Sequence, residues 1–154
     1  MNSDTPRKIV ILDPLNAVSL ERFGALLPPG YDLVCARSRD ESHQKEIVAD
    51  AEFLISGQVP VTATVLRTAK KLRLLHKWGV GVDNFDLDTA RELGIPVARI
   101  TGGNSIPVAE YTLGLMIAAI RNLAYGHAEL MKGHWRGFPM PQESFMISGK
   151  TVGI

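Results

Sequence analysis

The stretch "KIVILDPLNAVSLERFGALLPPGYDLVCA" (residues 8–36) has the clearest strand–helix–strand pattern of the chain. It starts with an apolar run, continues with an amphipathic segment at residues 16–27, and returns to an apolar run at residues 31–36. Apolar runs that alternate with amphipathic helices are typical of βαβ units with parallel strands. Proline and glycine at residues 28–30 end the helix, because neither residue continues one well.

The same alternation continues to residue 100. It predicts further helices at residues 39–51, 62–69 and 86–93, and further strands at residues 52–56, 72–76 and 95–100. We expect Asp86 to cap the last of these helices and Gly94 to end it. Five strand–helix steps predict a small α/β domain with a doubly wound, flavodoxin-like parallel sheet.

Composition and charge narrow the class of protein. The chain has 154 residues, of which 45% are apolar and 21% charged, as suits a globular core. Its 17 basic and 16 acidic residues nearly cancel, so we predict neither a nucleic-acid nor a membrane partner. The N-terminus lacks the features of a secretory signal, which favours a cytoplasmic protein. The lone cysteine, Cys35, lies in an apolar run and is interpreted as a buried structural thiol.

The alternation of apolar runs and amphipathic segments stops after residue 101. This change predicts a first domain at residues 1–101 and a second segment at residues 102–154. We expect one long helix from about Ile106 to Lys132. Its first half is apolar on nearly every face, so it is predicted to be buried between two masses of protein. An irregular arm at residues 136–148 follows, and the final "GKTVGI" (residues 149–154) reads as the start of a β-strand.

The densest chemical signal is "LLHKWGVGVDNFD" (residues 74–86). Gly79 and Gly81 match the first two glycines of a dinucleotide fingerprint, but Asn84 stands where the third glycine belongs. What remains is a tight turn after a strand, where the amides of Val80 and Gly81 are expected to hold a small carboxylate. The alternative is a purely structural turn in which Asp83 and Asn84 cap neighbouring amides.

Other polar residues have a functional and a structural interpretation. Lys77 is a candidate to attract an acidic substrate, although a lysine near a strand end is more often solvated. Asn104 and Ser105 precede a helix start, a natural anion site, or one of them is simply the N-cap. His76 and Glu110 are assigned structural roles. The scattered histidines predict no metal site, and no nucleophile motif is present.

Four segments together resemble one enzyme family. In their order and spacing they resemble the D-isomer-specific 2-hydroxyacid dehydrogenases, the family of D-3-phosphoglycerate dehydrogenase and formate dehydrogenase. The segments are "KWGVGVDNFDLDTARELGIPV" (residues 77–97), "GGNSIPVAEYTLGLM" (102–116), "MKGHW" (131–135) and "GKTVGI". The resemblance is close from residue 72 onward, and the preceding βα units fit the variable substrate domain of that family.

The resemblance implies a function and a set of site residues. In this family a discontinuous substrate domain and a Rossmann domain close over a cleft, where hydride passes between NAD or NADP and a D-2-hydroxy or 2-oxo acid. It implies that the chain is the N-terminal part of such an enzyme, a homodimer, with residues 102–154 beginning the Rossmann domain. The implied substrate-binding residues are Gly79, Val80, Gly81, Lys77 and Asn104. The implied cofactor-binding residues are Val80, Ser105, Val108 and Thr112.

The chain also departs from the family pattern. "TGGN" at residues 101–104 stands where many members have Thr-Pro-Gly. The glycine-rich cofactor loop and the catalytic arginine, glutamate and histidine are expected beyond Ile154, so we assign no catalytic residue here. Residues 1–154 alone are therefore expected to be inactive. The alternative from another class of protein is a non-catalytic module that binds a carboxylate or takes part in subunit assembly.

Overall fold

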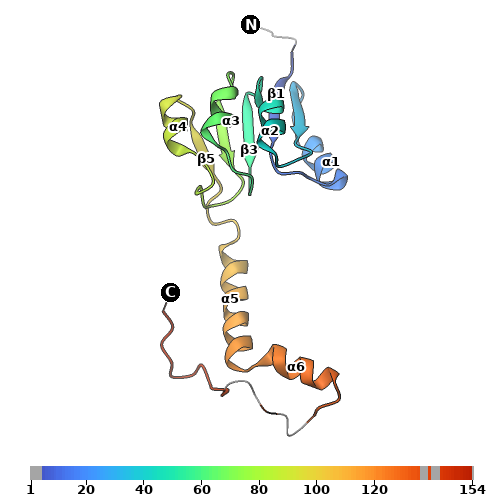
Figure 1. The fold of residues 1–154 in the computed structure, drawn as a ribbon, viewed down its shortest axis with the longest axis vertical. Helices are drawn as coiled ribbons and strands as arrows, with labels where there is room; N and C mark the ends of the chain where they lie inside the picture. Colours follow the sequence, from blue (N-terminus) through green and yellow to red (C-terminus); the bar gives the residue numbers. More distant parts are fainter. Residues whose placement is uncertain (1–4, 136–138, 140–142, 154) are drawn as a thin grey trace. The chain divides into compact units, whose positions relative to one another are not determined.

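The computed structural model describes residues 5–135, 139 and 143–153 of the chain. The chain divides into two compact units, Met1–Thr101 and Gly102–Ile154, and each unit is described by itself. Figure 1 shows the strands and helices of the first unit and the two helices of the second.

The first unit contains a five-stranded parallel sheet in the order β2-β1-β3-β4-β5. The strands are β1 (Arg7–Ile11), β2 (Tyr31–Cys35), β3 (Phe53–Ser56), β4 (Leu74–Lys77) and β5 (Val97–Arg99). The helices between them are α1 (Ala17–Ala25), α2 (Glu41–Val48), α3 (Ala63–Thr68) and α4 (Leu87–Glu92). This order is the flavodoxin-like one, so the predicted α/β fold is confirmed.

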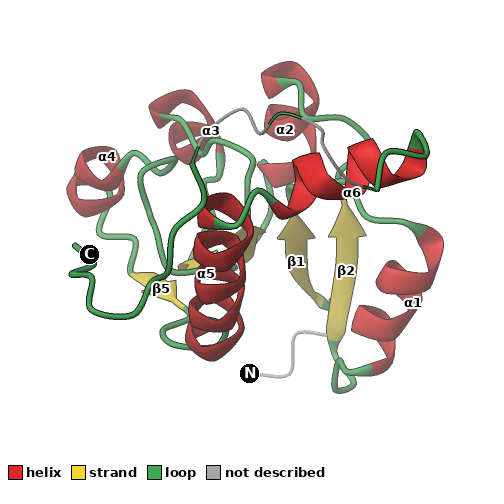
Figure 2. Ribbon diagram, turned by 90° about the horizontal axis from the view of Figure 1, so that it is seen from below, coloured by secondary structure: helices red, strands yellow, loops and turns green. Residues whose placement is uncertain are grey.

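Alternation along the strands gives the sheet two different faces. Helices α2, α3 and α4 lie side by side over one face, as Figure 2 shows for the first unit. The core is on that face and includes Val10, Leu54 and Leu75, all fully buried. On the opposite face, Trp78 follows β4 and its ring meets that of Phe23 from α1 edge-on, with centroids 5.0 Å apart.

Local signals cap and end helix α4 as expected. The side chain of Asp86 accepts a hydrogen bond of 2.8 Å from the amide of Thr89, and Gly94 follows α4 with φ 67°. The predicted cap and stop of this helix are confirmed.

Cys35 is half-buried, because β2 is an edge strand, and its thiol donates to the carbonyl oxygen of Asp13 at 3.4 Å. The prediction of a buried thiol is therefore wrong for Cys35, which is only half-buried.

The second unit corrects the prediction of one long buried helix. Two helices form, α5 (Ser105–Ile120) and α6 (Leu123–Met131), and Asn122 between them has φ 52°. Asparagine tolerates this left-handed conformation, and its buried side chain donates to the hydroxyl of Ser144 at 2.9 Å. No residue of α5 is buried, and Ile106 is 73% exposed. Burial of a helix on all faces requires packed protein on every side, which the described part of the second unit does not provide.

The end of the chain corrects a second prediction. The described residues of the arm, 139 and 143–148, form neither helix nor strand, as predicted, whereas residues 136–138 and 140–142 lie outside the described residues. Residues 150–153 form no strand, so that prediction is wrong for them, and Ile154 is also outside the described residues. A strand requires a neighbour that exchanges backbone hydrogen bonds, and the described residues of the second unit contain none.

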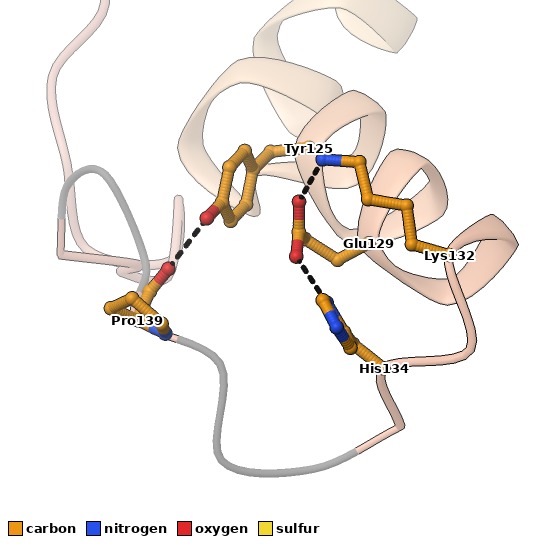
Figure 3. Close-up of polar contacts among 5 residues, drawn as sticks. All are labelled: Tyr125, Glu129, Lys132, His134 and Pro139. Carbon is orange, nitrogen blue, oxygen red and sulfur yellow. Dashed lines mark hydrogen bonds and ion pairs between the residues drawn. The ribbon is translucent and has the colours of Figure 1, made fainter.

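A polar cluster closes the end of α6, as Figure 3 shows. The carboxylate of Glu129, only 8% exposed, pairs with the ammonium of Lys132 and with Nδ1 of His134, each at 2.7 Å. The hydroxyl of Tyr125 donates to the carbonyl oxygen of Pro139 at 2.8 Å. The hydrogen bond from Lys132, followed by that from His134, lowers the pKa of Glu129.

The lowered pKa predicts how stability depends on pH. The charged carboxylate of Glu129 stabilises the end of α6 above its ordinary pKa of 4.5, and this contribution is lost as the pH falls through the lowered value. We expect Glu129→Gln to reduce the helical stability of α6 at neutral pH but not in strong acid. Circular dichroism during thermal unfolding at both pH values is the measurement, with Glu110→Gln on exposed α5 as the control. An equal loss at both pH values would contradict the prediction.

Candidate functional site

A fixed turn follows β4 at the carboxyl edge of the sheet, where ligands bind in open α/β folds. The amide of Trp78 donates to the carbonyl oxygen of Ser56 at 2.9 Å, which joins the start of the turn to the end of β3. The carbonyl oxygen of Gly79 accepts from the amide of Ile100 at 3.2 Å. Gly79 has φ 155°, a value that L side chains rarely adopt, so glycine is required there.

The amides of this turn are available to a ligand. Among the described residues, no hydrogen-bond acceptor is paired with the backbone N–H of Gly79, Val80 or Gly81. The turn borders a cavity of about 310 Å³. The lining residues are Gln58, Lys77, Trp78, Gly79, Gly81, Asp83 and Asn84. Val80 is not among them, and its side chain is 44% exposed. Successive free amides beside a cavity are a suitable site for a small anion.

Lys77 is buried, with 7% of its surface exposed, so its interpretation as a solvated lysine is wrong. Its ammonium donates to the carbonyl oxygen of Gly57 and, at 2.6 Å, to Oδ1 of Asn84. It also lies 5.4 Å from the centre of the Phe85 ring. No carboxylate in the described part of the chain forms an ion pair with it. Its direct partners are therefore neutral, and its positive charge remains available to an anion.

Asn84 joins the turn to the end of β3. Its Nδ2 donates to the carbonyl oxygens of Val59 at 2.9 Å and of Gly57 at 3.3 Å, while its Oδ1 accepts from Lys77. The interpretation in which Asn84 caps backbone amides is wrong, because its side chain bonds carbonyls and an ammonium instead. Asp83 is exposed and caps no amide in the described structure.

The start of α5 carries the remaining candidates. Asn104 occupies the N-cap position, but its side chain makes no capping hydrogen bond; its carbonyl oxygen accepts from the amide of Val108 at 3.0 Å. Ser105 is the first helical residue and is exposed. The hydroxyl of Thr112 donates to the carbonyl oxygen of Val108 at 2.7 Å, so its proton is engaged within the helix.

The candidates therefore form two groups. Lys77 and the turn at residues 79–81 come together at one cavity of the first unit, and the group from Asn104 to Thr112 lies on the first turns of α5 in the second unit. The sequence analysis did not identify Gln58, or the hydrogen bonds by which Asn84 joins the loops after β3 and β4. It also did not consider Asp13, an acidic residue two positions after the end of β1. The position of Asp13 at a carboxyl strand end was the signal that pointed to it.

Two further properties concern the described residues only. No group of three or more histidine, cysteine, aspartate or glutamate side chains is arranged there to hold a metal ion. None of the helices there combines the length and apolar character that a bilayer crossing requires.

Known proteins match most of the chain. The family model for the D-isomer specific 2-hydroxyacid dehydrogenase catalytic domain matches residues 9–151. D-3-phosphoglycerate dehydrogenase of Methanocaldococcus jannaschii is 35% identical over 96% of this chain and 27% of its own length. Formate dehydrogenase 2, mitochondrial, of Oryza sativa is 39% identical over 69% of this chain and 29% of its own length.

A solved structure agrees with these matches. NAD-dependent formate dehydrogenase from Staphylococcus aureus, in complex with NAD, superposes with a TM-score of 0.71 at 28% identity, over 84% of this chain and 43% of that one. The chain thus spans 27% of the length of the phosphoglycerate dehydrogenase relative and less than half of the solved enzyme. With a parallel sheet of the expected order and a family match over residues 9–151, the chain belongs to the D-isomer specific 2-hydroxyacid dehydrogenase family.

Proposed function

We propose that the protein at its native length transfers hydride between NAD or NADP and a small D-2-hydroxy or 2-oxo acid. In this proposal residues 1–101 belong to the substrate domain and residues 102–154 begin the cofactor domain. The observation that carries it is the turn after β4, where the amides of residues 79–81 have no partner in the described structure. Gly79 and Gly81 of this turn line the same cavity as the buried cation Lys77. Relatives named as phosphoglycerate and formate dehydrogenases support the reaction class.

The acid is bound through its carboxylate. Charge-assisted hydrogen bonds from backbone amides to a carboxylate are short and strong, and Gly79 and Gly81 have no side chain to shield those amides. Lys77 adds a positive charge whose direct partners are neutral. The carboxylate is common to every 2-hydroxy acid, so this part of the site recognises the class of substrate.

The nicotinamide cofactor, which supplies the hydride chemistry when bound, is assigned to the residues at the start of α5 and to Val80. These residues fit such a role because Val80 and Val108 expose apolar side chains, 44% and 52% exposed, and Ser105 exposes a hydroxyl. Thr112 presents its methyl group and its hydroxyl oxygen, since its proton is bonded to the Val108 carbonyl oxygen. Asn104 is assigned to the substrate. The proposal places proton transfer on groups outside residues 1–154.

The function is tested by assaying the protein at its native length. We expect reduction of glyoxylate, hydroxypyruvate or phosphohydroxypyruvate with NADH or NADPH. Lys77→Met should raise KM for the acid roughly tenfold and leave kcat within about twofold, because the lost charge binds substrate and transition state alike. Lys70→Met, at an exposed lysine without a side-chain partner in the described structure, is the matched control.

Two outcomes would oppose this proposal. Failure of the native-length protein to reduce any 2-oxo acid, with saturable binding of the acid retained, would favour the non-catalytic carboxylate-binding module. Turnover by residues 1–154 alone would show that the catalytic groups lie within this chain.

The apolar surface of α5 supports a second part of the proposal, that this helix is covered by protein in a homodimer of native length. Its exposed apolar side chains include Ile106, Val108, Tyr111, Leu113, Leu115 and Ile117. Contiguous apolar surface of this kind marks a site of association or a tendency to aggregate. The same surface also favours the alternative of a subunit-assembly module, which differs from the proposed dehydrogenase only in having no catalytic activity.

Residues 1–154 alone are therefore expected to associate. Sizing by light scattering should show species larger than the 16.8 kDa monomer, and Leu113→Glu with Leu115→Glu should shift the distribution towards monomer. The matched control is Val18→Glu on α1, where the valine is 59% exposed in the first unit. A stable, monodisperse monomer of the unaltered chain would contradict the expectation.

A further inference from the structure

Asp13 lies two residues after the end of β1, at the carboxyl edge of the sheet and between the ends of β2 and β3. Its two carboxylate oxygens are used separately. Oδ2 accepts from the amide of Gly57 at 2.5 Å, and Oδ1 accepts from the amide of Gln58 at 2.8 Å. Two successive amides at the end of β3 thus hold the carboxylate of Asp13 as such amides hold a bound anion.

One peptide group connects this carboxylate to Lys77. The peptide between Gly57 and Gln58 donates through its N–H to Asp13 and accepts through its C=O from the ammonium of Lys77. The dipole of that peptide is therefore aligned between a negative and a positive charge. Hydrogen bonds to charged groups are the strong ones, and each polarises the next in a chain.

Gly57 leaves room for the close approach of Asp13 to the loop after β3. A Cβ atom added to Gly57 would lie 3.3 Å from Oδ2 of Asp13, closer than most Cβ contacts. The carbonyl oxygen of Gly57 also accepts from Nδ2 of Asn84 at 3.3 Å. The position of this one loop therefore fixes Lys77 and Asn84 together, and both line the cavity beside the glycine turn.

We propose that Asp13 is a positioning residue for acid binding, which acts through the Gly57–Gln58 peptide to hold the ammonium of Lys77 at the cavity. This inference rests on the proposed function of the glycine turn. Asp13 is not among the residues that line the described cavity, so it is assigned no contact with the acid.

The direction in which Asp13→Asn changes the binding of the acid distinguishes a positioning role from a simple charge effect. Asp13→Asn removes a negative charge near the site, and by Coulomb attraction alone this would tighten the binding of an anionic acid. Loss of positioning has the opposite effect, because the peptide loses its charged acceptor and Lys77 is held less firmly. A purely structural role would lower the melting temperature and leave KM unchanged.

The test uses the protein at its native length. We expect Asp13→Asn to raise KM for the 2-oxo acid roughly tenfold, with kcat within about twofold. In the Lys77→Met background the same substitution should change KM by less than about twofold, because the residue it positions is gone. Asp32→Asn, at an exposed aspartate on β2, is the control. A lowered or unchanged KM, or the same factor in both backgrounds, would overturn the inference.

A second readout does not depend on activity. Acylation of lysines, followed by mass spectrometry, should label Lys77 several-fold faster in Asp13→Asn than in the unaltered protein, with exposed Lys70 as the internal reference. Asp13→Ser replaces Asp13→Asn if the latter does not fold. Absence of dehydrogenase activity would refute the proposed function, whereas unchanged labelling of Lys77 in a folded variant would refute the role of Asp13.

Discussion

A buried ammonium group with neutral partners is the constraint on which the site depends. Lysine side chains normally extend to water, and removing the charge from water is costly unless hydrogen bonds replace the lost hydration. Here the Gly57 carbonyl oxygen, the Asn84 side chain and the Phe85 ring surround the ammonium of Lys77. These groups come from two loops that meet only because β3 and β4 are neighbours in the sheet. The parallel order of the strands therefore determines whether the cation is held at the cavity.

The contacts of Asn84 also explain why the turn after β4 keeps its amides unpaired. Asn84 bonds to carbonyl oxygens of the loop after β3, and Val61 forms an isolated bridge with Phe85. The turn is thus held by contacts on either side of residues 79–81, and none of those contacts uses the amides of these residues in the described structure. A site fixed in this way is organised before a ligand arrives, which reduces the entropy lost on binding.

The two helices of the second unit differ in what stabilises them. Helix α5 is apolar along most of its length and yet has no buried residue, whereas α6 is secured by the polar cluster around Glu129. Apolar surface gains stability only when protein covers it. The chain spans 27% of the length of the phosphoglycerate dehydrogenase relative, and the described residues leave the apolar surface of α5 uncovered.

Three features could be predicted from the sequence: the alternation of strands and helices, the cap at Asp86, and the glycine turn at residues 79–81. These features are local, since periodicity, capping and backbone freedom depend on a few neighbouring residues. The sequence did not reveal the partners of Lys77, the side-chain contacts of Asn84 or the contacts of Asp13. These contacts join residues up to 45 positions apart. The sequence also did not reveal the break at Asn122, whose side chain bonds Ser144, or the missing strand at residues 150–153, which has no pairing neighbour among the described residues of the second unit. Local patterns set which elements form, whereas the burial of charge and the pairing of strands depend on which segments meet in space.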